Sequence, residues 1–322
     1  MCGIIGYLGA RSAVPVIIEG LRKLEYRGYD SAGIAVIDDS GKLDVRRALG
    51  KLRNLGDAIH VHPLSGQTGI GHTRWATHGR PSEENAHPHV GPRNRAAVVH
   101  NGIIENYVAL RQELESAGHT FTTEADTEVI AHLIEDCLED DFTVAVRNTV
   151  QRLQGSFAIS VICVEEPQKI VAARYGPPVV VGLGQDEYFL ASDVTPLLSH
   201  TRDMFFLSDG DMAVLTRDGV RLMDFSGKPI NRSITHVLWD PIMAEKGGFK
   251  HFMLKEIYEQ PRSVRETFST RIGQESGNIY LNEMELEPAE LAAIKQIKIA
   301  ACGTSWHAAI AGKFMLEKLA RI

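Results

Sequence analysis

The residue best suited to chemistry is the second one in the chain. Cys2 follows Met1, and the apolar, glycine-flanked run at 3–6 after it predicts a buried strand. We expect an aminopeptidase to remove Met1, because the side chain that follows it is small. Cys2 would then carry a nucleophilic thiol and a free α-amine, whose usual pKa of about 7.7–8.0 lets it accept the thiol's proton. The alternative is an ordinary small, buried cysteine.

If Cys2 attacks an amide carbonyl, the oxyanion that forms needs preorganised hydrogen-bond donors. Asn101 and Gly102 follow a predicted strand and offer a carboxamide N–H beside an unhindered backbone N–H. The same pair of residues is also typical of a plain Asn-Gly turn. From the residues alone, both interpretations stay open.

An amino-acid substrate would need a cation for its α-carboxylate and an anion for its α-ammonium group. Arg74 suits the first role, because a guanidinium binds a carboxylate through two hydrogen bonds. Asp126 suits the second role. The alternatives are a surface ion pair for Arg74 and a helix N-cap for Asp126, which precedes a predicted helix.

Histidines raise the separate hypothesis of a metal site. Two His-x-His pairs occur, and two further histidines stand near one of them (His60, His62, His72, His78, His87 and His89). Carboxylates do not stand at the spacings of metal-binding helices, and the other cysteines are scattered through the sequence. We therefore predict no metal and no cofactor, and we expect His78 and His87 to stabilise loops around a substrate.

A different signal lies between a predicted strand at 297–301 and a predicted helix at 306–321. The backbone N–H groups of a helix N-terminus, together with nearby hydroxyls, can bind phosphate, and the candidate residues here are Cys302, Gly303, Thr304 and Ser305. The segment is not a Walker A loop, because Gly312-Lys313 lies too far along the chain. An ordinary helix cap is the alternative.

The composition is that of an ordinary soluble globular protein. The chain has 322 residues, 44% of them apolar and 23% charged, with a net charge of −7. That charge argues against nucleic acid or an anionic membrane as the main partner, and no run approaches the roughly 18–20 apolar residues that span a bilayer. The chain start does not resemble a secretory signal, and the four cysteines lie far apart, as in a reduced cytoplasmic protein.

Hydrophobic periodicity predicts how the chain folds around these residues. Helices are predicted at 14–24, 104–117, 127–138 and 142–153, and strands at 34–37, 43–49 and 96–100, before a β-rich stretch from 156 to about 231. The Gly- and His-rich block at 66–92 is predicted to be a long ordered loop, and such loops are usually functional. Strands at both ends with helices between them indicate a mixed α/β sandwich.

The length of the chain suggests two domains. We predict a first domain at 2–240, a linker at 241–287 that contains a helix from about 253, and the start of a second domain at 288–322. One strand and two helices cannot bury a sheet by themselves, so the last segment is expected to be the first part of a larger domain.

Five blocks of this sequence, in the same order, resemble the class II, or N-terminal-nucleophile, glutamine amidotransferases. They are Cys2-Gly3-Ile4, residues 27–33 (RGYDSAG), residues 72–79 (HTRWATHG), His100-Asn101-Gly102 and Asp126-Thr127-Glu128. Residues 253–261 (MLKEIYEQP) and 301–305 (ACGTS) are similar to the connector and to the opening of the sugar-isomerase domain in one branch of that family. The acceptor in that branch is fructose 6-phosphate.

The resemblance implies an α+β chain that forms a four-layer αββα N-terminal-nucleophile hydrolase sandwich. A linker and the first strand and helices of an α/β sugar-isomerase domain would follow. Cys2 would attack the side-chain amide of glutamine, with Asn101 and Gly102 as the oxyanion hole. The remaining implied site residues are Arg74, Trp75, Thr77, His78 and Asp126 for glutamine, and Cys302, Gly303, Thr304 and Ser305 for a sugar phosphate.

The same resemblance implies glucosamine 6-phosphate and glutamate as products, with ammonia passing inside the protein and Trp75 placed to gate it. The full-length protein would be a homodimer. Two features depart from the family: Trp306 stands where many members have Tyr, and the sugar-isomerase part stops after its first strand and helix. This chain alone is therefore expected to act only as a glutaminase. The alternatives are an amidotransferase with another acceptor and a non-catalytic module that binds glutamine or sugar phosphate.

Overall fold

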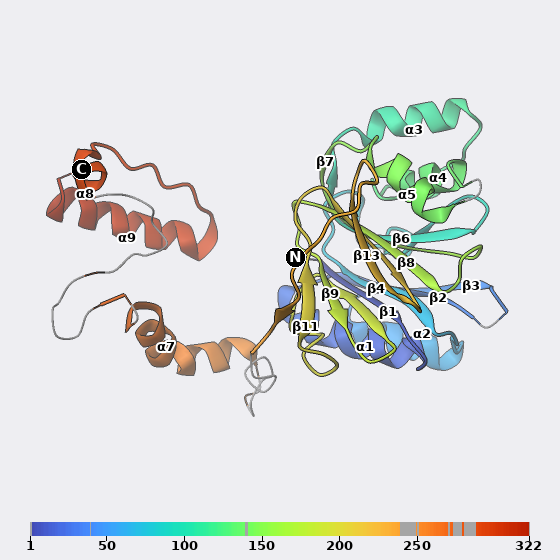
Figure 1. Cartoon of the computed structure of the whole chain (residues 1–322), viewed down its shortest axis with the longest axis horizontal. Coiled ribbons are helices and arrows are strands. Elements are labelled where there is room, and N and C mark those ends of the chain that lie inside the picture. The colour runs from blue at the N-terminus through green and yellow to red at the C-terminus, as the bar shows by residue number, and fades with distance from the viewer. Residues whose placement is uncertain are drawn as a thin grey trace. The chain divides into compact units, whose positions relative to one another are not determined.

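The computed structural model of the chain describes residues 2–38, 40–138, 141–238, 249, 251–269, 271–272, 279 and 288–321. The chain divides into two compact units, Met1–Phe252 and Met253–Ile322 (Figure 1). Most of the predicted linker at 241–287 lies outside the described residues. The domain boundary predicted at 240 stays a prediction.

The described part of the first unit contains two antiparallel sheets. The eight-stranded sheet has the order β14 (Thr235–His236), β11 (Asp203–Phe206), β9 (Val180–Leu183), β10 (Tyr188–Ala191), β1 (Gly3–Leu8), β4 (Thr68–Arg74), β2 (Ser31–Ile37), β3 (Leu43–Leu49). The six-stranded sheet has the order β13 (Gly219–Asp224), β12 (Asp211–Thr216), β8 (Lys169–Tyr175), β7 (Gly155–Cys163), β6 (Ala96–Ile104), β5 (His89–Val90). Nearly all of the strands predicted between 34 and 231 are present.

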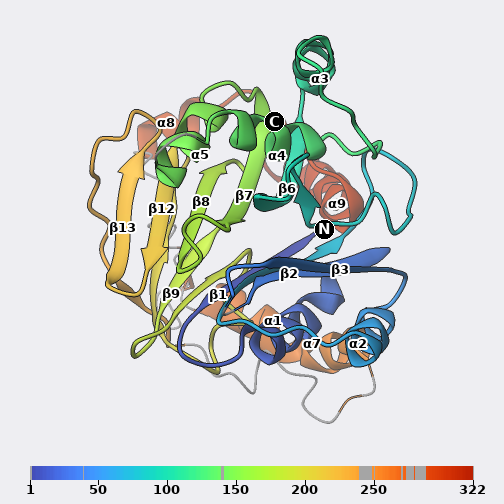
Figure 2. The same ribbon diagram turned by 90° about the vertical axis from the view of Figure 1, so that its right-hand side faces the viewer.

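Helices cover the outer face of each sheet, so the unit has four layers (Figure 2). The helices α1 (Ala13–Leu24) and α2 (Leu52–Val61) pack on the eight-stranded sheet, and a short 3₁₀ turn, η1 (Glu25–Arg27), follows α1. The helices α3 (Tyr107–Ser116), α4 (Glu128–Asp136) and α5 (Phe142–Val150) lie on the side of the six-stranded sheet. This arrangement is the predicted αββα sandwich, and the predicted fold class is confirmed.

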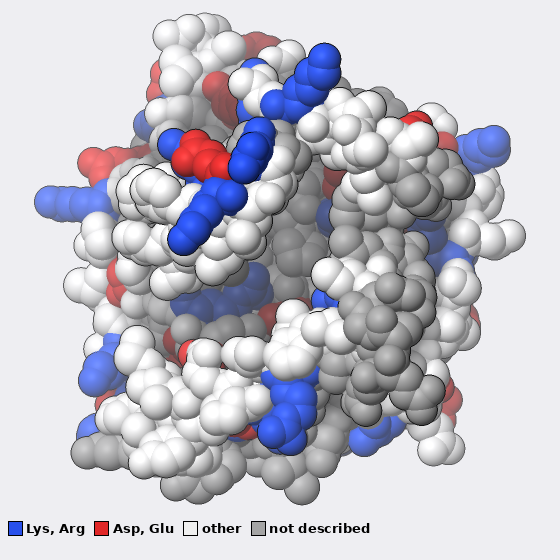
Figure 3. Space-filling model, turned by 90° about the vertical axis from the view of Figure 1, so that its left-hand side faces the viewer, with Lys and Arg blue, Asp and Glu red and all other residues white. Residues whose placement is uncertain are grey.

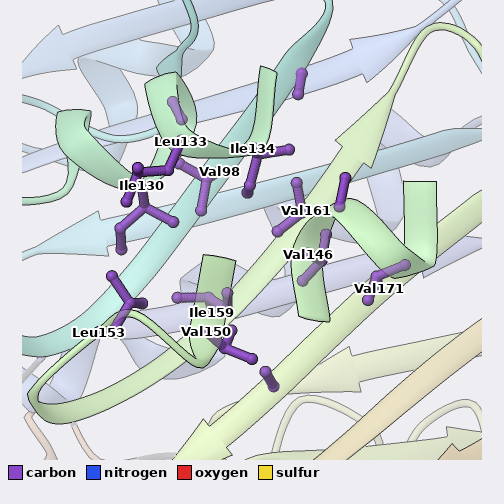
Figure 4. Close-up of a cluster of buried hydrophobic side chains, with 14 of the residues drawn as sticks. Val98, Ile130, Leu133, Ile134, Val146, Val150, Leu153, Ile159, Val161 and Val171 are labelled. Carbon is purple, nitrogen blue, oxygen red and sulfur yellow. The ribbon is translucent and has the colours of Figure 1, made fainter. Parts of the chain in front are cut away.

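Three apolar clusters separate the four layers. One lies between α1, α2 and the eight-stranded sheet, where Ile17, Leu21 and Leu24 are fully buried at helical spacing. Burial of each such side chain contributes about 1.5–3 kcal/mol. A second cluster joins α4 and α5 to the six-stranded sheet (Figure 4). The third fills the space between the two sheets.

Side-chain alternation along β1 decides where Cys2 faces. Ile5 and Tyr7 belong to the cluster under α1, whereas Ile4 and Leu8 belong to the cluster between the sheets. Because successive strand residues face opposite sides, Cys2 shares a side with Ile4 and faces the second sheet. A nucleophile at position 2 is therefore directed into the sandwich by the strand that follows it.

The prediction of a loop throughout 66–92 was wrong, because β4 lies in that block between β1 and β2. Two glycines weaken the alternating pattern of side chains from which this strand could be predicted. A Cβ on Gly71 would lie 2.3 Å from the Ile17 side chain, and one on Gly69 would lie 2.9 Å from it. Glycine is depleted in strands in general, but here it lets α1 approach the sheet closely.

Two further strand predictions are corrected. The strand predicted to end at His100 continues as β6 to Ile104, because all nine of its residues pair with β7. The strand predicted at 297–301 does not form, since no regular structure is assigned there. A strand needs a hydrogen-bonded neighbour, and this segment pairs with no other described strand.

The described part of the second unit is helical. It contains α7 (Phe252–Ser269), α8 (Pro288–Ala293) and α9 (Gly303–Leu319), with one isolated bridge between Ile272 and Ile279. Among the described residues, none of the helices combines the length and the apolar character needed to cross a membrane.

Candidate active site

Cys2 lies at the start of β1, beside the end of β4. The register pairs Gly3 with Thr73, which brings Cys2 next to the chain that leaves β4. The backbone N–H of Trp75 donates to Cys2 Sγ at 3.2 Å, and the thiol lies 3.5 Å from the carbonyl oxygen of the same residue. The sulfur is therefore held in one place by the main chain of its neighbour.

The surroundings of Cys2 keep its thiol protonated. Burial raises the pKa of the Cys2 thiol above its ordinary value, and Asp30 adds to this effect. The Trp75 N–H and the Arg74 guanidinium act in the opposite direction without cancelling it. A thiol with a raised pKa needs a nearby base before it can act as a nucleophile.

Asn101 reaches Cys2 from the opposite sheet. Its Nδ2 donates to the carbonyl oxygen of Cys2 at 3.4 Å, and its Oδ1 lies 2.9 Å from His72 Nε2. Gly102 follows within β6 with φ +129°, and a Cβ there would lie 2.0 Å from the carbonyl oxygen of Ser156. Asn101 and Gly102 are thus strand residues, and the alternative of a plain turn was wrong.

Arg74, the last residue of β4, is almost completely buried. Its Nη2 donates to the carbonyl oxygens of His78 and Gly79, which leaves Nη1 buried without a hydrogen-bond partner in the described structure. Burial lowers the pKa of Arg74, and Asp30, Cys2 and Asp126 lie close enough to raise it in part. A surface ion pair, the alternative for Arg74, was wrong.

Asp126 is buried between β6 and α4. Its Oδ2 accepts a hydrogen bond from the backbone N–H of Ile104 at 2.9 Å. The residue that precedes α4 is Thr127, so the alternative interpretation of Asp126 as the N-cap was wrong. The Asp126 carboxylate raises the pKa of Arg74 through its charge, so the two side chains belong to the same site.

The remaining predicted residues lie along the segment after β4. Trp75 and Thr77 are exposed, and the Trp75 ring lies against Gly28, where a Cβ would be 3.1 Å away. His78 is half-buried, and its ring meets that of Tyr107 edge-on at 5.2 Å. Its Nδ1 is buried and has no hydrogen-bond partner in the described structure. The role of these side chains in binding a ligand stays a prediction.

Four buried histidines form a cluster that contacts Asn101 through His72. The rings of His72 and His87 stack at 4.3 Å, and His87 also meets His89 at 4.8 Å and His100 at 6.4 Å. Burial lowers the pKa of all four, that of His72 to about 3, so the rings are neutral at pH 7. No group of three or more His, Cys, Asp or Glu side chains in the described residues is arranged to hold a metal ion.

Sequence reasoning missed two residues of this site. Asp30 accepts a hydrogen bond from the backbone N–H of Ala76 at 2.5 Å, and its own N–H donates to the carbonyl oxygen of Arg74 at 2.7 Å. His72 contacts Asn101 across the sandwich. Both stand inside blocks noted from the sequence, but only the pairing of strands shows what they touch.

The predicted phosphate-binding residues lie in the second unit. Cys302 is the N-cap of α9, its side chain makes no capping hydrogen bond, and Gly303 begins the helix. All four residues from Cys302 to Ser305 are exposed. They are thus in a different unit from Cys2, Arg74, Asn101 and Asp126.

Two stacked antiparallel sheets between helical layers, with a cysteine before a central strand, define the N-terminal-nucleophile class of α+β fold. Residues 33–217 match the family model of the glutamine amidotransferase domain. The chain belongs to that family.

Relatives and solved structures agree with this assignment. Isomerizing glutamine–fructose-6-phosphate aminotransferases from Clostridium tetani and Symbiobacterium thermophilum are each 49% identical over 322 residues, which are 100% of this chain and 53% of each relative. The chain thus spans about half the length of the curated relatives it matches. The B. subtilis glutamine phosphoribosylpyrophosphate amidotransferase is similar in structure, with a TM-score of 0.61 and 29% identity over 72% of this chain and 50% of that one.

Proposed function

We propose that this chain hydrolyses the side-chain amide of glutamine, as the N-terminal part of an isomerizing glutamine–fructose-6-phosphate aminotransferase. The observation that carries the proposal is the meeting of Cys2, which immediately precedes β1, with Asn101 of β6 and Arg74 of β4. The family membership and the named relatives support the same chemistry.

Two half-reactions follow from this geometry. The α-amine of Cys2, free once Met1 is removed, takes the thiol proton, and the sulfur forms a bond to the amide carbon of glutamine. The Asn101 Nδ2–H and the Gly102 N–H stabilise the oxyanion. Collapse of the tetrahedral intermediate breaks the C–N bond. The α-amine passes its proton to the leaving nitrogen, which departs as ammonia. Water then attacks the thioester, glutamate is released, and the thiol is restored.

Binding of glutamine uses the groups that the protein leaves without a partner. The buried Arg74 Nη1 can donate to the α-carboxylate of glutamine. The Asp126 carboxylate balances the α-ammonium group, and Trp75, Thr77 and His78 line the space around the ligand. Asparagine is one methylene shorter, so we expect it to be a poor substrate.

The whole protein's activity is proposed from the relatives. Ammonia from glutamine would convert fructose 6-phosphate to glucosamine 6-phosphate, with Cys302, Gly303, Thr304 and Ser305 beginning the sugar-phosphate pocket. Residues 2–240 would be the glutaminase domain, 241–287 the linker and 288–322 the start of the sugar-isomerase domain. We also propose a homodimer for the full-length protein.

We propose the cytoplasm as the compartment and no nucleic-acid or membrane partner. None of the described cysteines forms a disulfide, and the net charge is −7. Figure 3 shows basic and acidic side chains among uncharged ones.

The test is glutamate release from glutamine by protein with a native N-terminus, with the mass of that N-terminus checked first. The Cys2→Ser variant should lose the activity, whereas Cys137→Ser, a change at another half-buried cysteine, should retain it. Near-normal glutamate release by Cys2→Ser, or calorimetric binding of glutamine without hydrolysis by the wild type, would contradict the proposal. With the full-length protein, formation of glucosamine 6-phosphate separates this acceptor from any other.

A further inference from the structure

His72 is a fully buried residue of β4 that faces the second sheet. Side chains of β4 alternate, so that Ile70 lies in the cluster between the sheets while a Cβ on Gly71 would meet α1. His72 shares the side of Ile70, and Asn101 shares the side of Val99 in β6, which lies in the same cluster. The two polar side chains therefore meet in the space between the sheets.

The contact between these side chains fixes which way the Asn101 carboxamide points. The two ends of a carboxamide are nearly equal in size, but one donates hydrogen bonds and the other only accepts them. A stabilising donor for an oxyanion requires that Nδ2 face Cys2. The 3.4 Å bond from Nδ2 to the Cys2 carbonyl oxygen is too long to hold this orientation firmly.

The 2.9 Å contact between His72 Nε2 and Asn101 Oδ1 is the shorter and stronger of the two. Because Oδ1 can only accept, Nε2 must carry the hydrogen, and the neutral ring then leaves Nδ1 without one. If Asn101 turned over, its NH₂ group would face the Nε2–H of His72, and two donors would oppose each other. Turning would also aim Oδ1 at the position of the oxyanion.

The His72 ring is itself held in place. It stacks on the His87 ring at 4.3 Å, and His87 Nδ1 accepts the backbone N–H of His100 at 3.3 Å. Since His100 precedes Asn101 in β6, the strand that carries the carboxamide also holds the His87 ring on which His72 stacks. The ring cannot swing away without moving this support.

We propose that His72 is a positioning residue that fixes the Asn101 carboxamide with its Nδ2 directed at the oxyanion formed on Cys2. This role rests on the proposed glutamine hydrolysis. His72 touches neither Cys2 nor the substrate; it acts through Asn101. Its contribution should therefore appear in the chemical step and leave substrate binding by Arg74 and Asp126 unchanged.

The experiment compares three variants of the chain with a native N-terminus. His72→Leu removes the donor, and His72→Gln restores an N–H donor near the position of Nε2. His89→Leu is the matched control, because His89 is also buried in the same cluster but packs against the His87 ring, whereas the ring that contacts Asn101 is that of His72. Each variant is assayed for kcat and KM with glutamine, and for the rate at which iodoacetamide alkylates Cys2.

Loss of one oxyanion donor costs about 10²–10³ in kcat, so loss of its orientation in His72→Leu should cost about 10- to 100-fold, with KM within about 3-fold. His72→Gln should recover most of the lost kcat, and His89→Leu should stay within about 3-fold of the wild type. Alkylation forms no oxyanion, so Cys2 should react with iodoacetamide at the wild-type rate in all three.

Each other outcome has a distinct meaning. Equal losses of kcat in His72→Leu and His89→Leu, no recovery in His72→Gln, or a parallel fall in alkylation would overturn the positioning role in favour of general structural support. Wild-type kcat in His72→Leu would also overturn it. A wild-type protein that alkylates at Cys2 but releases no glutamate would instead refute the proposed function.

Discussion

The glycine at position 102 provides the sharpest test of how the fold and the site depend on each other. In Gly102→Ala the new Cβ would lie 2.0 Å from the carbonyl oxygen of Ser156, whereas side-chain Cβ atoms essentially never approach closer than 3.0 Å. The oxygen belongs to the neighbouring strand β7, so β6 and β7 must separate locally by about 1 Å. The variant must therefore lose ladder hydrogen bonds.

The expected cost has two parts. A non-glycine residue at φ +129° costs about 1–3 kcal/mol, and two lost backbone hydrogen bonds cost about 1 kcal/mol each. The free energy of unfolding of Gly102→Ala should therefore fall by about 3–5 kcal/mol. The displaced Gly102 N–H should also lower kcat for glutamine hydrolysis by about 100-fold or more.

Urea unfolding and glutaminase kinetics measure these two effects. The matched control is Gly118→Ala, because Gly118 also has a positive φ, +96°, but a Cβ there meets nothing within 4 Å. This control should lose only about 1–3 kcal/mol and keep its kcat. If the two variants lose the same free energy of unfolding, or if Gly102→Ala retains wild-type kcat, the reasoning about the clash and the oxyanion donor is refuted.

Three further predictions concern substrate binding, the general base and pH. Arg74→Lys should raise KM for glutamine by about 10- to 100-fold with a smaller change in kcat, because an ammonium group cannot bind the His78 and Gly79 carbonyl oxygens and also present the donor that Nη1 offers to the α-carboxylate; unchanged KM would contradict the assignment. A peptide left in front of Cys2 should lower kcat by about 10²–10⁴, and removing it with a protease that exposes Cys2 should restore activity. His72 is neutral in the folded protein, where its pKa is about 3, but charged in the unfolded chain below about pH 6.5. The unfolded state therefore binds one more proton at His72 between these values, so His72 alone should lower the free energy of unfolding by up to about 1.4 kcal/mol per pH unit as pH drops from 6.5 towards 3; His72→Leu should remove this contribution and leave that of the other buried histidines.

The residues of the site were predictable from their chemical types and their order in the chain. Cys2, Asn101 and Arg74 each had an ordinary structural alternative, and only their combination favoured an enzyme site. The structure removes two of those alternatives, because Asn101 lies in a strand and Arg74 is buried. The roles of these residues in glutamine hydrolysis stay predictions.

The parts that the sequence did not predict depend on tertiary pairing. The two glycines in β4 weaken the local strand signal, and they make sense only when α1 is packed against them. The segment at 297–301 has the composition of a strand, but a strand forms only beside a partner. Likewise the contact between His72 and Asn101 requires the stacking of two sheets, which no local pattern contains.

The position of the site explains why it can be both polar and precise. Alternation in β1, β4 and β6 turns Cys2, Arg74 and Asn101 towards the same space, in which residues such as Ile4 and Val99 form an apolar core. Polar groups at the end of that core must be hydrogen-bonded or neutral, because burial penalises charge. The neutral histidines meet this requirement, and the ring of His72 still supplies a donor to Asn101. Because Asn101 pairs with Ala158 of β7 and Arg74 pairs with Ser31 of β2, the donors are held by the sheets, and the oxyanion donor can be aligned before the substrate arrives.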